Sequence, residues 1–372
     1  MKIGFDAKRA FFNRSGLGNY SRNTIRILLK YFPDNEYTLF TPSLENAIQF
    51  INTDNITTCL PRGNFNKIFK SYWRSYNISQ QLFSNNIELY HGLSNELPLN
   101  IHKTRVRSVV TIHDLIFLRH PHLYKPTDRF FYKRKSDYCS KNADIIIAIS
   151  EQTKLDLINY LKTPKEKIIV VYQGCDPIFY KEVPGDLKNA IKEKYHLPSQ
   201  YILQVGTIEE RKNLLSTVKA IKKGKINIPL VVIGKSTKYA GFVKKYISEN
   251  QIENIHFLHN VVTEDLPAIY QMADVFIYPS VFEGFGIPIL EAIASKTPVI
   301  TTREGCFKEA GGESSIYIDP LNIEQLTDVI IKVLSDSKIR EQMVKDGYNF
   351  AQNFREDILA KNLINVYNQA VL

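Results

Sequence analysis

The sequence predicts an α/β protein with two doubly wound parallel sheets, and three observations lead to this class. Short apolar segments alternate with longer amphipathic ones along the whole chain. The connections between successive short segments are mostly long, as parallel strands require. A stretch containing several Pro and Gly residues at 173–200 interrupts the alternation once, and the same pattern then begins again.

In the first half of the chain, apolar β-branched runs predict strands and amphipathic runs predict helices. The expected strands are 2–6, 36–41, 88–91, 107–112, 144–149 and 167–172. The expected helices are 18–31, 65–83, 126–142 and 151–161. Tyr20, Thr24 and Ile27 share one face of the first helix, and Ser150 is a suitable N-cap for the last.

The second half repeats this pattern. Its expected strands are 201–205, 229–233, 255–258, 275–278, 298–301 and 315–318. Its expected helices are 213–223, 240–250, 265–272, 288–295, 323–335, 339–354 and 356–370. No fixed repeat of 20 to 50 residues is present, so a solenoid is not predicted.

These elements predict the domain organisation. We expect an N-terminal domain at 1–173, a linker region at 174–199 and a C-terminal domain at 200–355, with the helix at about 356–372 packing back on the N-terminal domain. Doubly wound domains bind ligands at the carboxyl ends of their strands. The expected site therefore lies in a cleft between the two domains.

Composition excludes several classes of protein. Hydrophobic residues make up 44% and charged residues 23% of the 372 residues, which is ordinary globular usage. Apolar runs are shorter than the roughly 18 residues that a membrane span needs, and charges interrupt any signal-peptide core at the N-terminus. The four cysteines form no C-x-x-C pair, which fits a reducing cytoplasm. We expect a cytoplasmic protein, with a peripheral position on the inner face of the membrane as an option.

The net charge of +10 belongs to one half of the chain. Residues 1–173 carry 25 Lys and Arg against 14 Asp and Glu, or +11, and residues 174–372 carry 23 against 24, or −1. Such asymmetry points to an anionic partner for the first half, such as nucleic acid, anionic lipid or a phosphorylated substrate.

The most informative segment is 280–291, with the sequence SVFEGFGIPILE. A strand ends before it, a turn containing two glycines follows, and Pro288 suits the first turn of a helix. The backbone N–H groups of such a turn, together with the helix dipole, favour an anion. Glu283 and Glu291 are placed to accept hydroxyl hydrogen bonds from a sugar and a ribose. Taken singly, Glu283 is better explained as a helix cap and Glu291 as a solvated residue, but the whole segment after a strand favours a functional site.

The spacing of these two carboxylates resembles the E-x7-E signature of family 4 retaining glycosyltransferases. Four further segments resemble that family in the same order: the glycine loop at 16–20, the His-Asp pair at 113–114, the loop at 205–213, and the stretch 265–280 that leads into the signature. The resemblance covers nearly the whole chain. It implies the GT-B fold, in which two Rossmann-like domains hold a nucleotide sugar mainly through the C-terminal domain.

The resemblance also implies roles for individual residues. Glu283, His113 and Lys212 are the expected catalytic residues, with Lys212 stabilising the charge of the leaving diphosphate. The expected donor-binding residues are Gly16, Gly18, Arg211, Lys212, Gly284, Phe285, Gly286, Ile287 and Glu291. We expect Glu283→Ala to abolish transfer and to leave the fold intact.

The implied reaction moves a hexose from a nucleotide sugar with retention at the anomeric carbon, through an oxocarbenium-like transition state. No D-x-D motif is present, so we expect metal-independent transfer and no cofactor. GDP-mannose is the preferred donor, and a UDP-sugar is the alternative. Thr207 stands where the family commonly has Arg, which leaves Arg211 and Lys212 to hold the diphosphate. His259 stands where the family often has Gly, near the expected position of the base, which leaves the nucleobase open.

The basic N-terminal half is the expected acceptor domain. Two segments there, 65–83 and 125–135, interleave Lys and Arg with Phe, Tyr and Trp, a pattern that suits an anionic membrane surface as well as a solvated face over core aromatics. The expected acceptor is a saccharide or a lipid-linked saccharide of a bacterial envelope polysaccharide. A sugar-nucleotide epimerase of the same fold is the alternative enzyme. A nucleic-acid-binding protein or a nicotinamide oxidoreductase is disfavoured, because no motif of either class is present.

Overall fold

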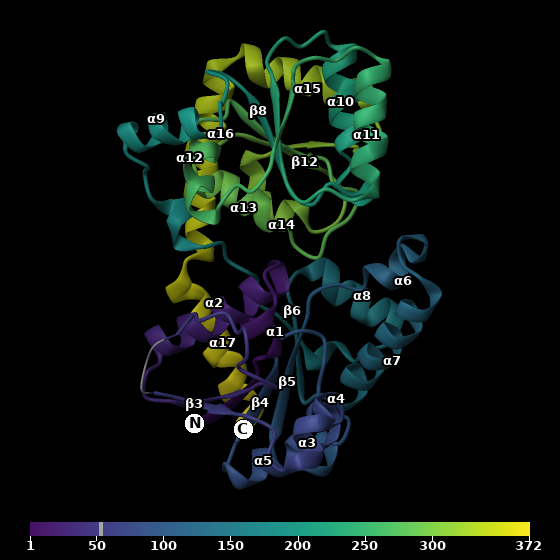
Figure 1. Ribbon diagram of the computed structural model, residues 1–372, viewed down its shortest axis with the longest axis vertical. Coiled ribbons are helices and arrows are strands. Elements are labelled where there is room, and N and C mark those ends of the chain that lie inside the picture. The colour runs from purple at the N-terminus through teal and green to yellow at the C-terminus, as the bar shows by residue number, and fades with distance from the viewer. Residues whose placement is uncertain (52–54) are drawn as a thin grey trace. The chain divides into compact units, whose positions relative to one another are not determined.

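The computed structural model describes residues 1–51 and 55–372, and the chain divides into two compact units, each built on one parallel sheet (Figure 1). The first unit is Met1–Gln173 together with Glu356–Leu372, and the second is Gly174–Arg355. The first unit thus ends at the predicted domain boundary and includes the C-terminal helix. The segment 174–199, predicted as a linker, is part of the second unit and contains helix α9 (Gly185–Lys194).

The sheet of the first unit has the strand order β3-β2-β1-β4-β5-β6-β7, and every pairing is parallel. The strands are β1 (Lys2–Asp6), β2 (Glu36–Phe40), β3 (Ile56–Cys59), β4 (Leu89–Gly92), β5 (Arg107–Ile112), β6 (Ile145–Ala148) and β7 (Ile168–Val170). The edge strand β3 was not predicted. Its Ile-Thr-Thr-Cys sequence carries little apolar pattern, and its pairing with β2 places it in the sheet.

Alternate residues of the central strands enter two separate cores. In β5, Val109 packs into one core and Val110 into the other. In β6, Ile145 and Ile147 face the first core, whereas Ile146 faces the second. Because both faces of the sheet are covered, β6 is apolar throughout and β5 has apolar residues on both faces at its centre.

Helices cover both faces of this sheet. They are α1 (Lys8–Phe12), α2 (Gly16–Tyr31), α3 (Asn64–Ile68), α4 (Lys70–Tyr72), α5 (Ile78–Ser84), α6 (Ile116–Arg119), α7 (Pro126–Asn142), α8 (Glu151–Leu161) and α17 (Glu356–Val371). Figure 1 shows α17 beside α2 in this unit. Glu356 at the start of α17 pairs with Arg26 and Lys30 of α2, and the Tyr367 hydroxyl lies 2.6 Å from His91 Nδ1 of β4.

The segment 65–83, expected to be one helix, is broken into α3, α4, a π-helical turn at Trp73–Asn77 and α5. Phe69 leaves the helical region, with φ −96° and ψ 58°, between α3 and α4. Two residues of this segment therefore do not fit the interpretation as a membrane-facing surface. Trp73 is fully buried, and Arg74 forms ion pairs with Asp6 and Glu96.

The sheet of the second unit has the order β10-β9-β8-β11-β12-β13 and is also parallel. Its strands are β8 (Ile202–Val205), β9 (Leu230–Ile233), β10 (Ile255–Leu258), β11 (Val275–Tyr278), β12 (Val299–Thr302) and β13 (Ile316–Ile318). Its other helices are α10 (Leu214–Lys223), α11 (Lys238–Glu249), α12 (Leu266–Gln271), α13 (Ile287–Ala294), α14 (Phe307–Gly311), α15 (Ile323–Ser335) and α16 (Ser337–Ala351). From β8, the strands β9 and β10 follow on one side of the sheet and β11, β12 and β13 on the other, so the strand order reverses between β8 and β11. This is the position at which doubly wound sheets bind ligands.

Within residues 1–51 and 55–372, no helix combines the length and the apolar character that a membrane span requires.

Candidate functional site

The loops that follow β8 and β11 meet at the carboxyl edge of the second sheet. Val275 of β11 pairs with Ile202 of β8, so the chain leaves both strands side by side. The loop after β8 forms a 3-10 turn at Glu210–Lys212, and the loop after β11 carries Ser280 and Glu283. The Val281 N–H donates to the carbonyl oxygen of Arg211 at 2.8 Å and ties the two loops together.

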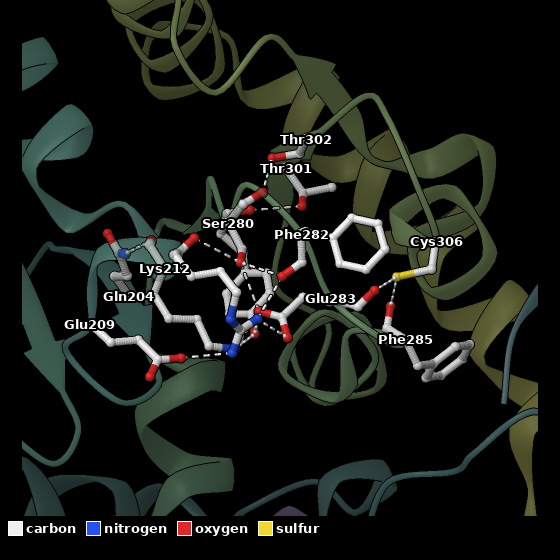
Figure 2. A network of polar contacts seen from close by, with 12 residues as sticks. Gln204, Glu209, Lys212, Ser280, Phe282, Glu283, Phe285, Thr301, Thr302 and Cys306 are labelled. Carbon is white, nitrogen blue, oxygen red and sulfur yellow. Dashed lines mark hydrogen bonds and ion pairs between the residues drawn. The ribbon is translucent and has the colours of Figure 1, made fainter. Parts of the chain in front are cut away.

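Glu283 lies at the centre of a buried polar network (Figure 2). Its carboxylate forms an ion pair with Lys212 and a second with Arg211, whose Nη1 lies 2.6 Å from Oε2. The Tyr278 hydroxyl donates to Oε1 at 3.0 Å, and Ser280 Oγ lies 2.7 Å from the same oxygen. The network brings three of the predicted site residues into direct contact.

The charges of this network are strongly perturbed. Burial by itself would raise the pKa of Glu283, but Lys212 and Arg211 outweigh it and hold that pKa at about 2. Burial lowers the pKa of Lys212 despite the opposing effect of Glu283. Glu209 is a second partner of Arg211, with Oε1 2.6 Å from Nη2. Glu283 is therefore an ionised carboxylate that holds two cations, and it does not cap a helix.

The N-terminus of α13 begins directly after this network. Its N-cap is Gly286, with φ +115°, a conformation that favours glycine, and Pro288 occupies the first turn. Cys306 Sγ lies 3.2 Å and 3.0 Å from the carbonyl oxygens of Glu283 and Phe285, and these contacts hold the loop in place (Figure 2). The Phe285 side chain is buried and packs against Phe354, so only its backbone is placed to serve a ligand.

Glu291 lies one turn into α13, and its environment differs from that of Glu283. Burial raises its pKa to about 7, although the Tyr270 hydroxyl donates to Oε2 at 3.0 Å. The two carboxylates of the E-x7-E pattern thus have opposite pKa shifts. Glu283 is charged across the neutral range, whereas Glu291 changes protonation within it.

His113 belongs to the first unit and follows the end of β5. Its Nε2 lies 2.9 Å from the carbonyl oxygen of Leu93, so Nε2 carries the proton, and Nδ1 accepts from the Gln173 side chain at 3.1 Å. Burial lowers the pKa of His113 to about 4, and the ring is neutral. The Tyr20 ring packs edge-on against it at 4.6 Å. Contact with a ligand through Nδ1 requires that Gln173 be displaced.

The two predicted glycines of the first unit have different surroundings. Gly16 begins α2, and no atom would touch a Cβ placed there, so its backbone is open to a ligand. A Cβ on Gly18 would lie 1.8 Å from the carbonyl oxygen of Asn13. Gly18 is therefore explained by the close approach of α2 to the preceding loop.

Several residues of these networks were not predicted. Tyr278 and Ser280 lie in the stretch 265–280 that carried the resemblance, at the end of the fully buried strand β11 and just after it, where the sequence gives no sign of a polar role. Gln173 is the last residue of the predicted N-terminal domain, and Cys306 lies in a loop without a motif. Among the described parts of the chain, no group of three or more His, Cys, Asp or Glu side chains is placed to hold a metal ion.

Comparisons with known proteins address the family. The model of "Glycosyltransferase Family 4" matches residues 15–179, and the model of "Glycosyl transferases group 1" matches residues 188–350. Together the two models match most of the chain. The chain belongs to the family 4 glycosyltransferases.

Curated relatives and a solved structure agree with this membership. O-antigen chain mannosyltransferase B of Escherichia coli is 29% identical to this glycosyltransferase over 75% of this chain and 74% of the relative. O-antigen chain mannosyltransferase RfbU of Salmonella typhimurium is 28% identical over 70% and 71%. The crystal structure of Anabaena HepE in complex with UDP and glucose has a TM-score of 0.76 at 16% identity, covering 99% of this chain and 100% of that one. The GT-B fold expected from the sequence is confirmed.

The ion pairs of Glu283 give a first prediction. Replacement by Ala leaves Arg211 and Lys212 as neighbouring buried cations, which costs about 3–5 kcal/mol of unfolding free energy in the second unit. This differs from the sequence-based expectation that Glu283→Ala leaves the fold intact. Urea unfolding followed by far-UV circular dichroism measures the change in unfolding free energy. Glu264→Ala, at an exposed position, is the control and is expected to change this free energy by less than about 0.5 kcal/mol.

The same ion pairs fix the sign of the pH dependence. Because the pKa of Glu283 is about 2 in the folded chain and 4.5 ordinarily, its contribution is fully present above pH 4.5 and is lost as pH falls towards 2. Glu283→Gln should lack this acid-dependent loss. Equal stability of wild type and Glu283→Ala at pH 7 would show that the ion pairs contribute nothing.

Proposed function

We propose that this glycosyltransferase moves a mannosyl group from GDP-mannose, with retention at the anomeric carbon, to a saccharide or lipid-linked saccharide acceptor of a bacterial envelope polysaccharide. A UDP-hexose is the alternative donor. The mannosyl group and the envelope polysaccharide are supported by the two O-antigen mannosyltransferases, which are similar to most of the chain.

The observation that carries this proposal is the cluster of Glu283, Arg211 and Lys212 beside the N-terminus of α13. Two cations and a helix N-terminus gather at the ligand-binding edge of the second sheet, which is the arrangement that a diphosphate needs. In the unliganded chain Glu283 pairs with both cations, and Glu209 is the second carboxylate beside Arg211. A donor diphosphate bound there also pairs with the two cations. The Glu283 carboxylate is then available to accept a hydrogen bond from the sugar.

The proposed chemistry follows from this exchange. The bond between the anomeric carbon and the diphosphate oxygen breaks, and the acceptor hydroxyl forms the new bond on the same face of the sugar. The leaving diphosphate takes the acceptor proton. Lys212 and Arg211 stabilise the charge that develops on the leaving group. Because fixed cations supply this stabilisation, we propose that transfer needs no metal ion and no cofactor.

Incubation with radiolabelled sugar nucleotides and a membrane extract as acceptor tests the proposal, with and without EDTA. We expect transfer of mannose from GDP-mannose at the same rate in both conditions. Lys212→Gln is expected to lower the rate at least a hundredfold, because one of the two cations at the leaving group is lost, and Lys238→Gln, an exposed lysine on α11, should leave it unchanged.

Three outcomes of this assay would contradict the proposal. Loss of transfer with EDTA would remove the metal-free mechanism. An inverted product would remove retention. Conversion of the sugar nucleotide into an isomer without any acceptor would favour the epimerase instead.

We also propose that the first unit contacts an anionic membrane surface. Phe130 and Phe131 of α7 are 60% and 59% exposed, and the neighbouring Lys133 and Arg134 are exposed as well. Aromatic side chains beside cations suit the interface of an anionic bilayer. The alternative interpretation, in which the aromatic residues of these segments belong to the core, is wrong for Phe130 and Phe131 of α7 and correct for Trp73.

Sedimentation with phosphatidylglycerol vesicles tests the membrane contact. We expect binding at low salt, weakening as salt rises, and at least a fivefold loss in the double variant Phe130→Ser and Phe131→Ser. Phe242→Ser on α11 is the matched control, because Phe242 is 58% exposed and lies in the other unit. Equal binding of all variants would remove α7 as the contact surface.

A further inference from the structure

A cavity of about 420 Å³ lies within the first unit, and nothing in the proposed donor site accounts for it. It is lined by charged residues of four separate segments: Lys8 after β1, Lys70 and Arg74 on the segment 70–77, Glu96 after β4, and Lys135 on α7. Its volume is within the range of about 300–1,000 Å³ that is usual for ligand pockets.

The position of the cavity matches the topology of the first sheet. Strand β1 lies between β2 and β4, so the sheet reverses its strand order between β1 and β4. Lys8 follows the carboxyl end of β1, and Glu96 lies in the loop after β4. The cavity therefore lies at the switch point, where doubly wound sheets bind their ligands.

Part of the cavity wall is a fixed ion-pair network. Arg74 Nε lies 3.0 Å from Asp6 Oδ2, and a second ion pair joins Arg74 to Glu96. Lys135 Nζ lies 2.8 Å from the other carboxylate oxygen of Glu96. Two cations and two carboxylates thus balance one another, and they hold the guanidinium of Arg74 in place.

The remaining charges of the wall are positive. Among the residues that the structure describes, the ammonium groups of Lys8 and Lys70 have no hydrogen-bond or ion-pair partner. Burial lowers the pKa of Lys8, and the neighbouring Arg74 lowers it further. The cavity therefore has an excess of two positive charges, and an anion bound in it would relieve their repulsion.

The surroundings identify the kind of anion. Ser71 and Ser75 also line the cavity, so hydroxyl donors accompany the cations, as phosphoryl oxygens require. On the same segment of chain, Phe65, Phe69 and Tyr72 form an exposed aromatic row, with ring centroids 4.8 Å and 5.7 Å from Phe65. An apolar chain attached to a bound phosphoryl group could lie along this row.

We propose that this cavity binds a diphosphate group carried on an apolar chain. We identify this group as the diphosphate of a lipid-linked acceptor. Its identification as the acceptor rests on the proposed function, whereas the binding of a diphosphate to the cavity does not. The site uses Lys8, Lys70 and Arg74 of the first unit alone. It is thus built independently of Arg211 and Lys212 in the second unit.

Calorimetric titration of the full chain with inorganic pyrophosphate and with geranyl diphosphate tests the proposal. Each titration is repeated with the Lys212→Gln variant, which weakens the diphosphate site proposed for the second unit, so that binding there is recognised. We expect both probes to bind, and geranyl diphosphate to bind at least tenfold more tightly. The double variant Lys8→Gln and Lys70→Gln is expected to weaken both at least tenfold.

Matched variants separate the possible causes. Lys67→Gln removes an exposed cation of α3 outside the cavity and should leave both affinities unchanged. Phe69→Ala should remove only the advantage of geranyl diphosphate. All of these side chains are exposed, and circular dichroism checks that each variant is folded.

Three results would overturn the proposal. Absence of pyrophosphate binding, or binding that Lys212→Gln abolishes, would show that there is no separate site. Equal weakening by Lys67→Gln would show general attraction to a basic surface. Equal affinity for the two probes would show that the cavity binds a diphosphate alone and does not recognise an apolar chain attached to it. The glycosyl-transfer assay is scored separately, so its failure leaves the binding result intact.

Discussion

The buried carboxylate of Glu283 and the two cations that it holds are the constraint on which the second unit depends. The Glu283 carboxylate pairs with Arg211 and Lys212 in a space that Tyr278 and Ser280 also enter, and removal of one partner of such a buried pair is strongly destabilising. The network therefore fixes the loops after β8 and β11 against each other before any ligand arrives. It also holds the two cations at the edge of the second sheet where we propose that the donor diphosphate binds.

The same solution occurs in both units of the chain. In the second unit, the switch point between β8 and β11 carries Glu283 with Arg211 and Lys212; in the first, the switch point between β1 and β4 carries Asp6 and Glu96 with Arg74 and Lys135. Each network positions its cations by pairing them with carboxylates. The two units differ in the groups that surround their ion pairs. The first has two further lysines around its cavity, and the second has a helix N-terminus beside its ion pairs. Some of the cations behind the +11 charge of residues 1–173 thus form internal ion pairs, and others remain on the surface.

Much of the fold could be predicted, because apolar β-branched runs between polar segments define buried parallel strands. The strands at 255–258 and 275–278 and the helix at 126–142 have the expected bounds. Strand β3 could not be predicted, because only its pairing with β2 makes it a strand. The break of 65–83 was missed because Trp73 and Arg74 turn inward, where a distant carboxylate at Asp6 receives the arginine. The pairing of Lys212 with Glu283 joins residues 71 positions apart. The sequence placed both at one site, but only the structure shows that they neutralise each other.

The most direct measurement is the affinity of GDP for three forms of the chain: wild type, Glu283→Gln and Lys212→Gln. If Glu283 is the resting counter-charge of a diphosphate site, removal of its charge frees two cations. Glu283→Gln should then bind GDP more tightly than wild type, by about tenfold, and Lys212→Gln should bind it less tightly by a similar factor. Glu283→Gln should also have lost transfer. Weaker binding by both variants, or an affinity that neither variant changes, would contradict the exchange of counter-anions on which the account depends.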